Sequence, residues 1–198
     1  MPNLMIDSED IAGTCMDNIH SFGASLRAFC KVNGGDVKLV MWKSDIEVAY
    51  HNIWLMKEWQ AKQTVTVGDK SYVDHCNCFG NHSSYKVFLS FSSLIAWIAE
   101  HVKHIHVKTY VDNNASFELV GDILYYEPYH QYFPTKQMKL LLLWDELSIL
   151  HAEKKQIYGP VVPFVGLDID PNLMSVSISD ERRAELIEKV LAFAKPGK

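Results

Sequence analysis

The stretch Lys43-Ser44-Asp45-Ile46-Glu47-Val48-Ala49-Tyr50 continues a run of β-branched, aromatic and other apolar residues that begins at Lys38. Such a run is typical of a buried strand, so Asp45 is expected where that strand ends. A second stretch, Tyr110-Val111-Asp112-Asn113, joins strand-like segments at 107–111 and 116–120, and the pair predicts a hairpin around Asn113-Asn114. Carboxylate oxygens are the ligands that magnesium prefers. Two carboxylates at such positions have the chemistry of magnesium ligands.

Helical and strand-like patterns alternate around these two stretches. An apolar helical face runs over 19–29 and stops at Gly34-Gly35. Further patterns predict a hairpin over 63–75, helices over 83–101, from Pro134 and from Ser179, and strands over 163–169 and 174–178. This order predicts an α+β fold, with helices packed on one face of a small antiparallel sheet. Residues 1–198 are expected to form one domain, with a core over 15–178 and a C-terminal helix over 179–195.

The composition argues against tight binding to nucleic acid. The formal net charge is −5 and only three arginines occur, whereas nucleic-acid-binding domains are normally basic. The start of the chain has no basic segment and no long apolar stretch, which predicts no signal peptide and no membrane span and leaves the compartment open. The four cysteines form no CxxC pair and are expected as reduced thiols. Asn81 and Asn114 stand in glycosylation sequons, which matter only in a secreted protein.

Four stretches, in this order, resemble the palm domain of reverse transcriptases, and they are most similar to palms of retroelements found in basidiomycete fungi. The first is Lys43–Tyr50. The resemblance implies that Asp45 is a metal ligand and that Tyr50 lies at the sugar edge of the nucleotide. The second is Cys78–Phe88. The resemblance places Phe79 and Gly80 beneath the template and the incoming nucleotide.

The third stretch, Tyr110–Asn113, resembles the Tyr-x-Asp-Asp hairpin of that family. Asp112 matches the first aspartate of the pair, whereas Asn113 replaces the second. The fourth, Phe164–Asp170, is similar to the hairpin that grips the primer, and Glu153–Gln156 resembles the segment whose lysine precedes that hairpin. The resemblance covers roughly residues 15 to 195.

Departures from the family pattern imply a palm that has degenerated and been domesticated. Nucleotidyl transfer uses two divalent ions, and Asn113 offers a neutral carbonyl where a third carboxylate is expected. His51-Asn52 stand where family members carry a basic residue. Less negative charge faces the ions, and less positive charge faces the nucleic acid. We therefore expect a catalytically inactive protein without a cofactor. Magnesium is expected only if polymerase activity survives.

The aromatic segment 125–133 suggests a different role for such a scaffold. Tyrosine is favoured at protein interfaces, so Tyr126, Tyr129 and Tyr132 are candidate partner-binding residues, although a loop packed on the palm explains the segment equally well. The interpretation is a protein-binding or regulatory, non-catalytic subunit; the small subunit of a fungal oxidase such as a heterodimeric laccase is one example. The alternatives are a minimal metal-dependent RNA-directed DNA polymerase using Asp45 and Asp112, and a nucleic-acid binder without catalysis, which the acidic charge disfavours.

Overall fold

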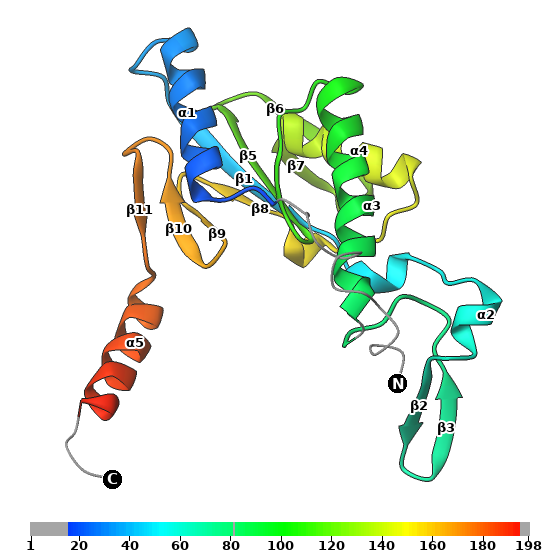
Figure 1. Ribbon diagram of the computed structural model, residues 1–198. Coiled ribbons are helices and arrows are strands. Elements are labelled where there is room, and N and C mark those ends of the chain that lie inside the picture. Colours follow the sequence, from blue (N-terminus) through cyan, green and yellow to red (C-terminus); the bar gives the residue numbers. More distant parts are fainter. Residues whose placement is uncertain (1–15, 81, 195–198) are drawn as a thin grey trace.

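A four-stranded antiparallel sheet lies at the centre of the fold (Figure 1). The computed structural model describes residues 16–80 and 82–194. Strand β1 (Leu39–Asp45) pairs along its whole length with β5 (Asn113–Leu119). The edges are β4 (Lys108–Tyr110), beside β5, and β8 (Ile157–Gly159), beside β1. The expected α+β class with small antiparallel sheets is confirmed.

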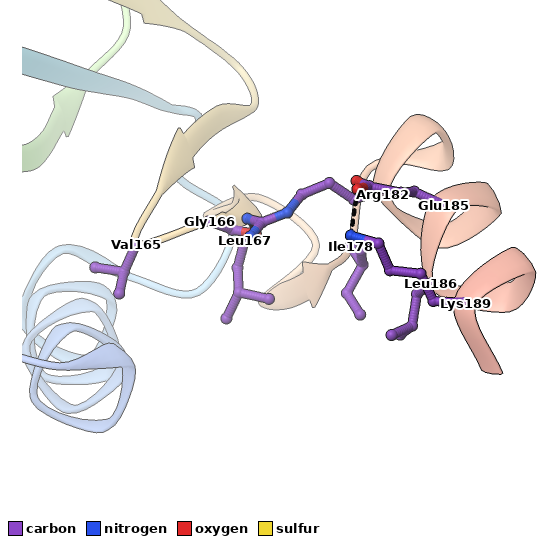
Figure 2. A pocket seen from close by; sticks show the side chains of 8 residues that line it. All are labelled: Val165, Gly166, Leu167, Ile178, Arg182, Glu185, Leu186 and Lys189. Carbon is purple, nitrogen blue, oxygen red and sulfur yellow. Dashed lines mark hydrogen bonds and ion pairs between the residues drawn. The ribbon is translucent and has the colours of Figure 1, made fainter. Parts of the chain in front are cut away.

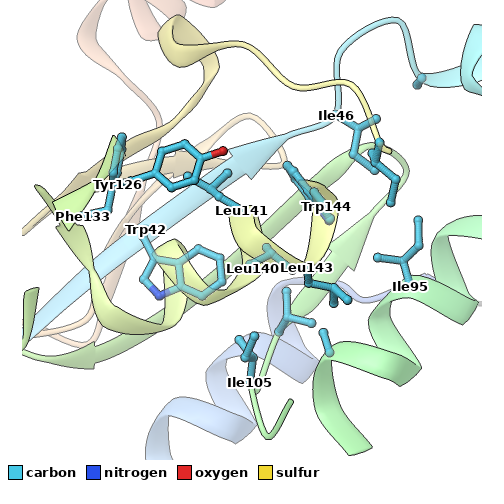
Figure 3. Packing of buried hydrophobic residues seen from close by; sticks show 14 of the residues in the cluster. Trp42, Ile46, Ile95, Ile105, Tyr126, Phe133, Leu140, Leu141, Leu143 and Trp144 are labelled. Carbon is cyan, nitrogen blue, oxygen red and sulfur yellow. The ribbon is translucent and has the colours of Figure 1, made fainter. Parts of the chain in front are cut away.

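Helices cover both faces of this sheet. Met41 and Trp42 are neighbours on β1 and both are fully buried, although successive side chains of a strand point to opposite faces. Helix α1 (Ile19–Asn33) covers the Met41 face, and α3 (His82–His101) and α4 (Thr135–Glu146) contribute to the cluster around Trp42 (Figure 3). The expectation of helices on one face only is therefore wrong. The sequence pattern of β1 does not show this, because the strand ends in the polar residues Lys43, Ser44 and Asp45, and two of the covering helices, α3 and α4, come from distant parts of the chain.

Smaller elements surround the sheet. They are α2 (Lys57–Gln60), the hairpin of β2 (Thr64–Val67) and β3 (Lys70–Val73), the hairpin of β6 (Ile123–Tyr126) and β7 (Gln131–Pro134), the three-stranded sheet of β9 (Val162–Phe164), β10 (Leu167–Asp170) and β11 (Ser175–Ser177), and 3-10 turns at Ala49–Asn52, Glu127–Tyr129 and Glu153–Lys155.

Two turns differ from their expected positions. The turn between β4 and β5 consists of Val111 and Asp112, because Tyr110 pairs with Asn113. The segment 163–169 is divided between two strands, because Val165 and Gly166 both adopt positive φ angles (52° and 75°). Two consecutive positive φ angles are what a tight two-residue hairpin turn requires.

Helix α5 (Asp180–Phe193) projects away from the sheet, with all of its residues exposed (Figure 1). The hydroxyl of Ser179 accepts a hydrogen bond from the Arg182 N–H, which caps the start of the helix. The helix occupies most of the predicted range 179–195. Over the described residues, no helix has the length and apolar character needed to cross a membrane.

Candidate active site

Strand pairing brings Asp45 and Asp112 together. Asp45 is the last residue of β1 and lies opposite Asn113 of β5, while Asp112 occupies the preceding turn. The backbone N–H of Ile46 donates a 3.1 Å hydrogen bond to the carbonyl oxygen of Asp112. Val111 enters the turn with a φ of 56°, which is unfavourable for a β-branched residue. The sheet thus presents the two carboxylates at one end, where the sequence motifs place them.

Lys155 occupies the space beside these carboxylates. Its Nζ lies 2.6 Å from Asp45 Oδ1 in a partly exposed ion pair. The 3-10 turn that ends at Lys155 leads into β8, and β8 pairs with β1 beside Asp45. The hydrogen bond to Asp45 raises the pKa of Lys155, with a further contribution from the charge of Asp112. The ammonium group therefore stays charged and neutralises part of the site.

Asp112 is partly buried in the turn between β4 and β5. Burial raises its pKa above the ordinary value, and the negative charge of Asp45 raises it further. The charge of Lys155 and a hydrogen bond from Asn113 act in the opposite direction. Asn113 Nδ2 donates this bond to Asp112 Oδ1 over 3.0 Å. Asn113 thus directs a donor toward the aspartate, where a second carboxylate would have added an acceptor.

The arrangement does not fit a pair of magnesium ions. Magnesium requires hard oxygen ligands in near-octahedral geometry. The Lys155 ammonium already contacts Asp45, and the Asn113 amide already contacts Asp112. Among the described residues, no group of three or more His, Cys, Asp or Glu side chains is arranged to hold a metal ion.

The residues implied in nucleotide binding lie next to the aspartates. The Tyr50 ring contacts the rings of Phe79 and Phe88 edge-on, at centroid distances of 4.6 and 5.3 Å. Burial and the charge of Asp112 raise the pKa of Tyr50. Phe79 is largely exposed, and Gly80 follows with a positive φ of 85°. The structure brings these residues together, and their role in nucleotide binding stays a prediction.

The charges around Asp112 predict opposite pKa shifts in two variants. Asp45→Asn is expected to lower the pKa of Asp112, because it removes a neighbouring negative charge. Lys155→Gln is expected to raise it, because it removes a neighbouring positive charge. Titration of the Asp112 carboxyl carbon by NMR measures both shifts. Two shifts of the same sign would contradict this description of the site.

The aromatic segment divides between the core and the surface. Tyr126 is only 1% exposed, so its interpretation as a surface contact is corrected. Of the four residues of β6, Tyr126 is buried and the other three are exposed. Tyr129 is partly buried, whereas Tyr132 on β7 is 55% exposed and packs edge-on against Tyr125.

A polar network joins the buried tyrosines to helix α4, and the sequence reasoning missed it. The Tyr126 hydroxyl donates to Asp145 Oδ2 over 2.7 Å, and His151 Nε2 lies 3.1 Å from Asp145 Oδ1. The Tyr129 hydroxyl lies 2.6 Å from His151 Nδ1. Burial and the bond to Asp145 raise the pKa of Tyr126, so both tyrosines remain hydroxyl donors. The network satisfies buried polar groups and fixes the aromatic segment to the fold.

Of the two sequon asparagines, the structure describes Asn114, whereas Asn81 lies outside the described residues. Asn114 is buried on β5, and its side-chain oxygen accepts a hydrogen bond from the Thr109 hydroxyl. A glycan needs an accessible asparagine, so the folded chain has no acceptor at Asn114.

Comparison with known proteins shows a likeness in fold. No family model matches the chain, and no curated protein matches it by sequence. Solved structures of the foamy viral protease-reverse transcriptase do match. The complex with an RNA/DNA hybrid has a TM-score of 0.55 at 18% identity over 74% of this chain. Two complexes with double-stranded DNA have TM-scores of 0.57 and 0.53 at 15% and 16% identity, over 74% and 78% of this chain.

The three matches cover 18%, 23% and 32% of the viral chains, so this chain spans less than a third of their length. The chain thus has a reverse-transcriptase-like fold.

Proposed function

We propose that this reverse-transcriptase-like chain is a degenerate palm from a retroelement of the basidiomycete type, that it no longer polymerises DNA, and that it acts as a protein-binding, non-catalytic subunit. The observation that carries the first part is the ion pair between Lys155 and Asp45. A cation must displace an ammonium group at 2.6 Å to bind Asp45, and among the described residues Asp45 and Asp112 belong to no group of three or more side chains that could hold a metal ion. Weak ion binding leaves the developing charge of nucleotidyl transfer unstabilised.

The charge of the chain supports the same proposal. Polymerases must hold a template and a primer, and that grip depends on basic side chains. This chain carries 19 Lys and Arg against 24 Asp and Glu. Several of the lysines are already paired with acids, as in the contacts of Lys108 with Asp17 and of Lys103 with Glu146. Basic side chains are thus outnumbered by acidic ones, and neighbouring acids neutralise part of their charge.

Primer extension tests the loss of catalysis. The wild-type chain, Asn113→Asp and Lys155→Ala are assayed on RNA and DNA templates with magnesium or manganese, and Asp45→Ala sets the background. We expect no variant to extend the primer above that background. Extension by the wild-type chain that disappears in Asp45→Ala would show an active polymerase. Circular dichroism of each variant confirms that it is folded.

The exposed tyrosine pair is the surface that we propose for a protein partner. Tyr125 and Tyr132 pack against each other on the outer side of the β6–β7 hairpin, at a centroid distance of 5.1 Å. Their neighbours Ile123 and Leu124 are also exposed. Tyrosine combines contact area with a polar tip at low entropic cost, which suits it to interfaces. The catalytic subunit of an oxidase, as in heterodimeric laccases, is one partner of this kind.

Tyrosine substitutions test this surface. The partner is identified by mass spectrometry after co-purification with the native chain, and binding is then measured with the two purified proteins. We expect Tyr132→Ala to weaken binding about tenfold or more, as loss of an interface tyrosine commonly does. Tyr72→Ala is the matched control, because Tyr72 is equally exposed on the separate β2–β3 hairpin. Equal affinities for the two variants would place the interface elsewhere.

A minimal RNA-directed DNA polymerase is the second candidate function. The observation that favours it is the proximity of Asp45 and Asp112. The two carboxylates are close enough for the charge of Asp45 to raise the pKa of Asp112. In that case Lys155 must leave Asp45 when an ion binds. Binding to a template-primer that weakens steeply with added salt, together with extension that depends on Asp45, would establish this function over the first.

A further inference from the structure

Helix α5 exposes a broad apolar surface. Five apolar side chains of this helix are at least half exposed: Leu186, Ile187, Val190, Leu191 and Phe193. No residue of the helix is buried by the rest of the described chain. An isolated helix of 14 residues is marginal in water, and helices in proteins gain most of their stability by packing an apolar face. The helix therefore requires a surface to pack against.

One contact fixes the position of α5 without covering this face. An N–H of the Arg182 guanidinium donates a 2.7 Å hydrogen bond to the carbonyl oxygen of Gly166, at the tip of the β9–β10 hairpin. A Cβ at Gly166 would overlap the guanidinium. Figure 2 shows Arg182 reaching from the helix to the hairpin across a hollow of about 420 Å³. Glu185, Leu186 and Lys189 also line this hollow, whereas Ile187, Val190 and Leu191 do not.

Side chains three and four residues apart form a seam along the outer side of the helix. Arg183, Ile187, Val190 and Ala194 follow this spacing and lie on one stripe. Phe193 and Leu186 flank the stripe on one side, and Leu191 and Ala184 flank it on the other. Apart from Arg183 in the stripe and Asp180 at the start of one flank, the stripe and both of its flanks are apolar. We propose that this seam pairs with the same seam of a second copy of the chain, in antiparallel orientation.

Arg183 determines the orientation. In a parallel pair, the two copies of Arg183 would face each other in the seam, where like charges repel. In an antiparallel pair that sets Ile187 opposite Val190, each Arg183 lies opposite Ala194 of the second copy. The last carbonyl groups of a helix lack intrahelical partners and carry the negative end of its dipole. Arg183 is available for them, because its ion pair with Asp180 is long, at 3.8 Å, and exposed.

The antiparallel register also matches side-chain sizes. It places Leu186 against Phe193 on one flank and the small Ala184 against Leu191 on the other. The charged residues Glu185 and Lys189 pair with each other beside the β9–β10 hairpin and stay outside the seam. Acidic residues outnumber basic ones on α5, which disfavours a membrane surface as the occupant. A two-fold pair of helices about 21 Å long buries less than a standard interface, so the association is expected to be weak and concentration-dependent.

Sedimentation equilibrium of the purified chain over a series of concentrations tests the pairing. We expect a monomer–dimer equilibrium whose dissociation constant rises about tenfold or more in Ile187→Gln, because each dimer loses two apolar side chains from the seam. Glu188→Gln is the matched control away from the seam and is expected to leave the dissociation constant unchanged. Since α5 packs against no core residue, neither change should unfold the chain. A wild-type chain that stays monomeric, or equal effects of the two variants, would overturn the proposal.

Cross-linking tests the orientation. Ile187→Cys and Val190→Cys are oxidised separately and as a mixture, and the linked peptides are identified by mass spectrometry. The antiparallel register predicts that the link between Cys at 187 and Cys at 190 forms fastest. This link can form only in the mixture, because each variant carries one of the two cysteines. Faster links between identical positions would show a parallel pair and overturn the proposed orientation. Neither test depends on whether the palm polymerises.

Discussion

Replacing Trp144 with alanine is expected to lower the free energy of unfolding by about 4 kcal/mol. Trp144 is 0% exposed and lies at the centre of the cluster that joins α3 and α4 to the sheet (Figure 3). Its neighbours there include Leu140, Leu141 and Ile149. Removing the indole leaves a cavity that this closely packed core fills only in part, because the surrounding helices and strands hold one another in place.

Leu142→Ala provides the control on the same helix. Leu142 is 43% exposed, so its truncation is expected to cost less than about 1 kcal/mol. Urea denaturation followed by far-ultraviolet circular dichroism measures both variants, and the tryptophan signal is not needed. Equal losses would show that α4 does not bury its Trp144 face as described. The comparison isolates packing, because both variants carry alanine, the best helix former.

A second large effect is expected in the dependence of the free energy of unfolding on pH, and it arises from Glu118. This residue lies on β5, is 3% exposed, and accepts hydrogen bonds from the Lys136 N–H at 2.9 and 3.2 Å. Burial raises the pKa of Glu118 to about 7, although the bonds from the first turn of α4 and the charge of Lys136 oppose the shift. The folded chain therefore holds a proton on Glu118 more tightly than the unfolded chain, in which the ordinary value of 4.5 applies.

The sign of the effect follows from this difference. A raised folded-state pKa contributes stability that is fully present below about pH 4.5 and is lost as the pH rises through about 7. Between these limits, the wild-type chain is expected to lose about 3 kcal/mol relative to Glu118→Gln, which cannot ionise. Urea denaturation of both proteins at several pH values measures this difference. A difference that stays constant with pH would show that Glu118 does not titrate in this range.

Glu127→Gln is the control for the pH experiment. Glu127 is exposed in the 3-10 turn that follows β6, so its replacement is expected to leave the pH profile of stability unchanged. The comparison also removes the effects of other titrating groups, because these are common to all three proteins. A profile altered equally by Glu127→Gln and Glu118→Gln would point to net charge rather than to burial.

The meeting of Asp45 and Asp112 was expected only from the resemblance to the reverse transcriptase palm, because the two residues lie far apart in the chain and meet through the pairing of β1 with β5. Local patterns place Asp45 at the end of a buried apolar strand and Asp112 beside a hairpin turn, but they do not place the two carboxylates next to each other. The pairing of Lys155 with Asp45 was not predictable in the same way. These residues are 110 positions apart, and they meet because β8 adds to the edge of β1. Strand order in a sheet is a property of the whole fold.

The tyrosines show the same division. Alternation along a strand implies that Tyr125 and Tyr126 point to opposite sides. It does not indicate which side faces the core, since a shift of one residue in register would exchange them. The network of Tyr126 with Asp145, and its contact with His151, determine the inward side. Tyr125 and Tyr132 are the exposed tyrosines of the segment and are available to another protein.

The sequence by itself determined the α+β class, the positions of the strand-end and turn aspartates, and the amphipathic C-terminal helix, because each depends on residues close together in the chain. The tertiary structure alone decided that both faces of the sheet are covered, that Lys155 neutralises Asp45, and that α5 is left without a partner in the described chain. Those features depend on contacts between distant segments, whose free energies are settled only when the whole core packs.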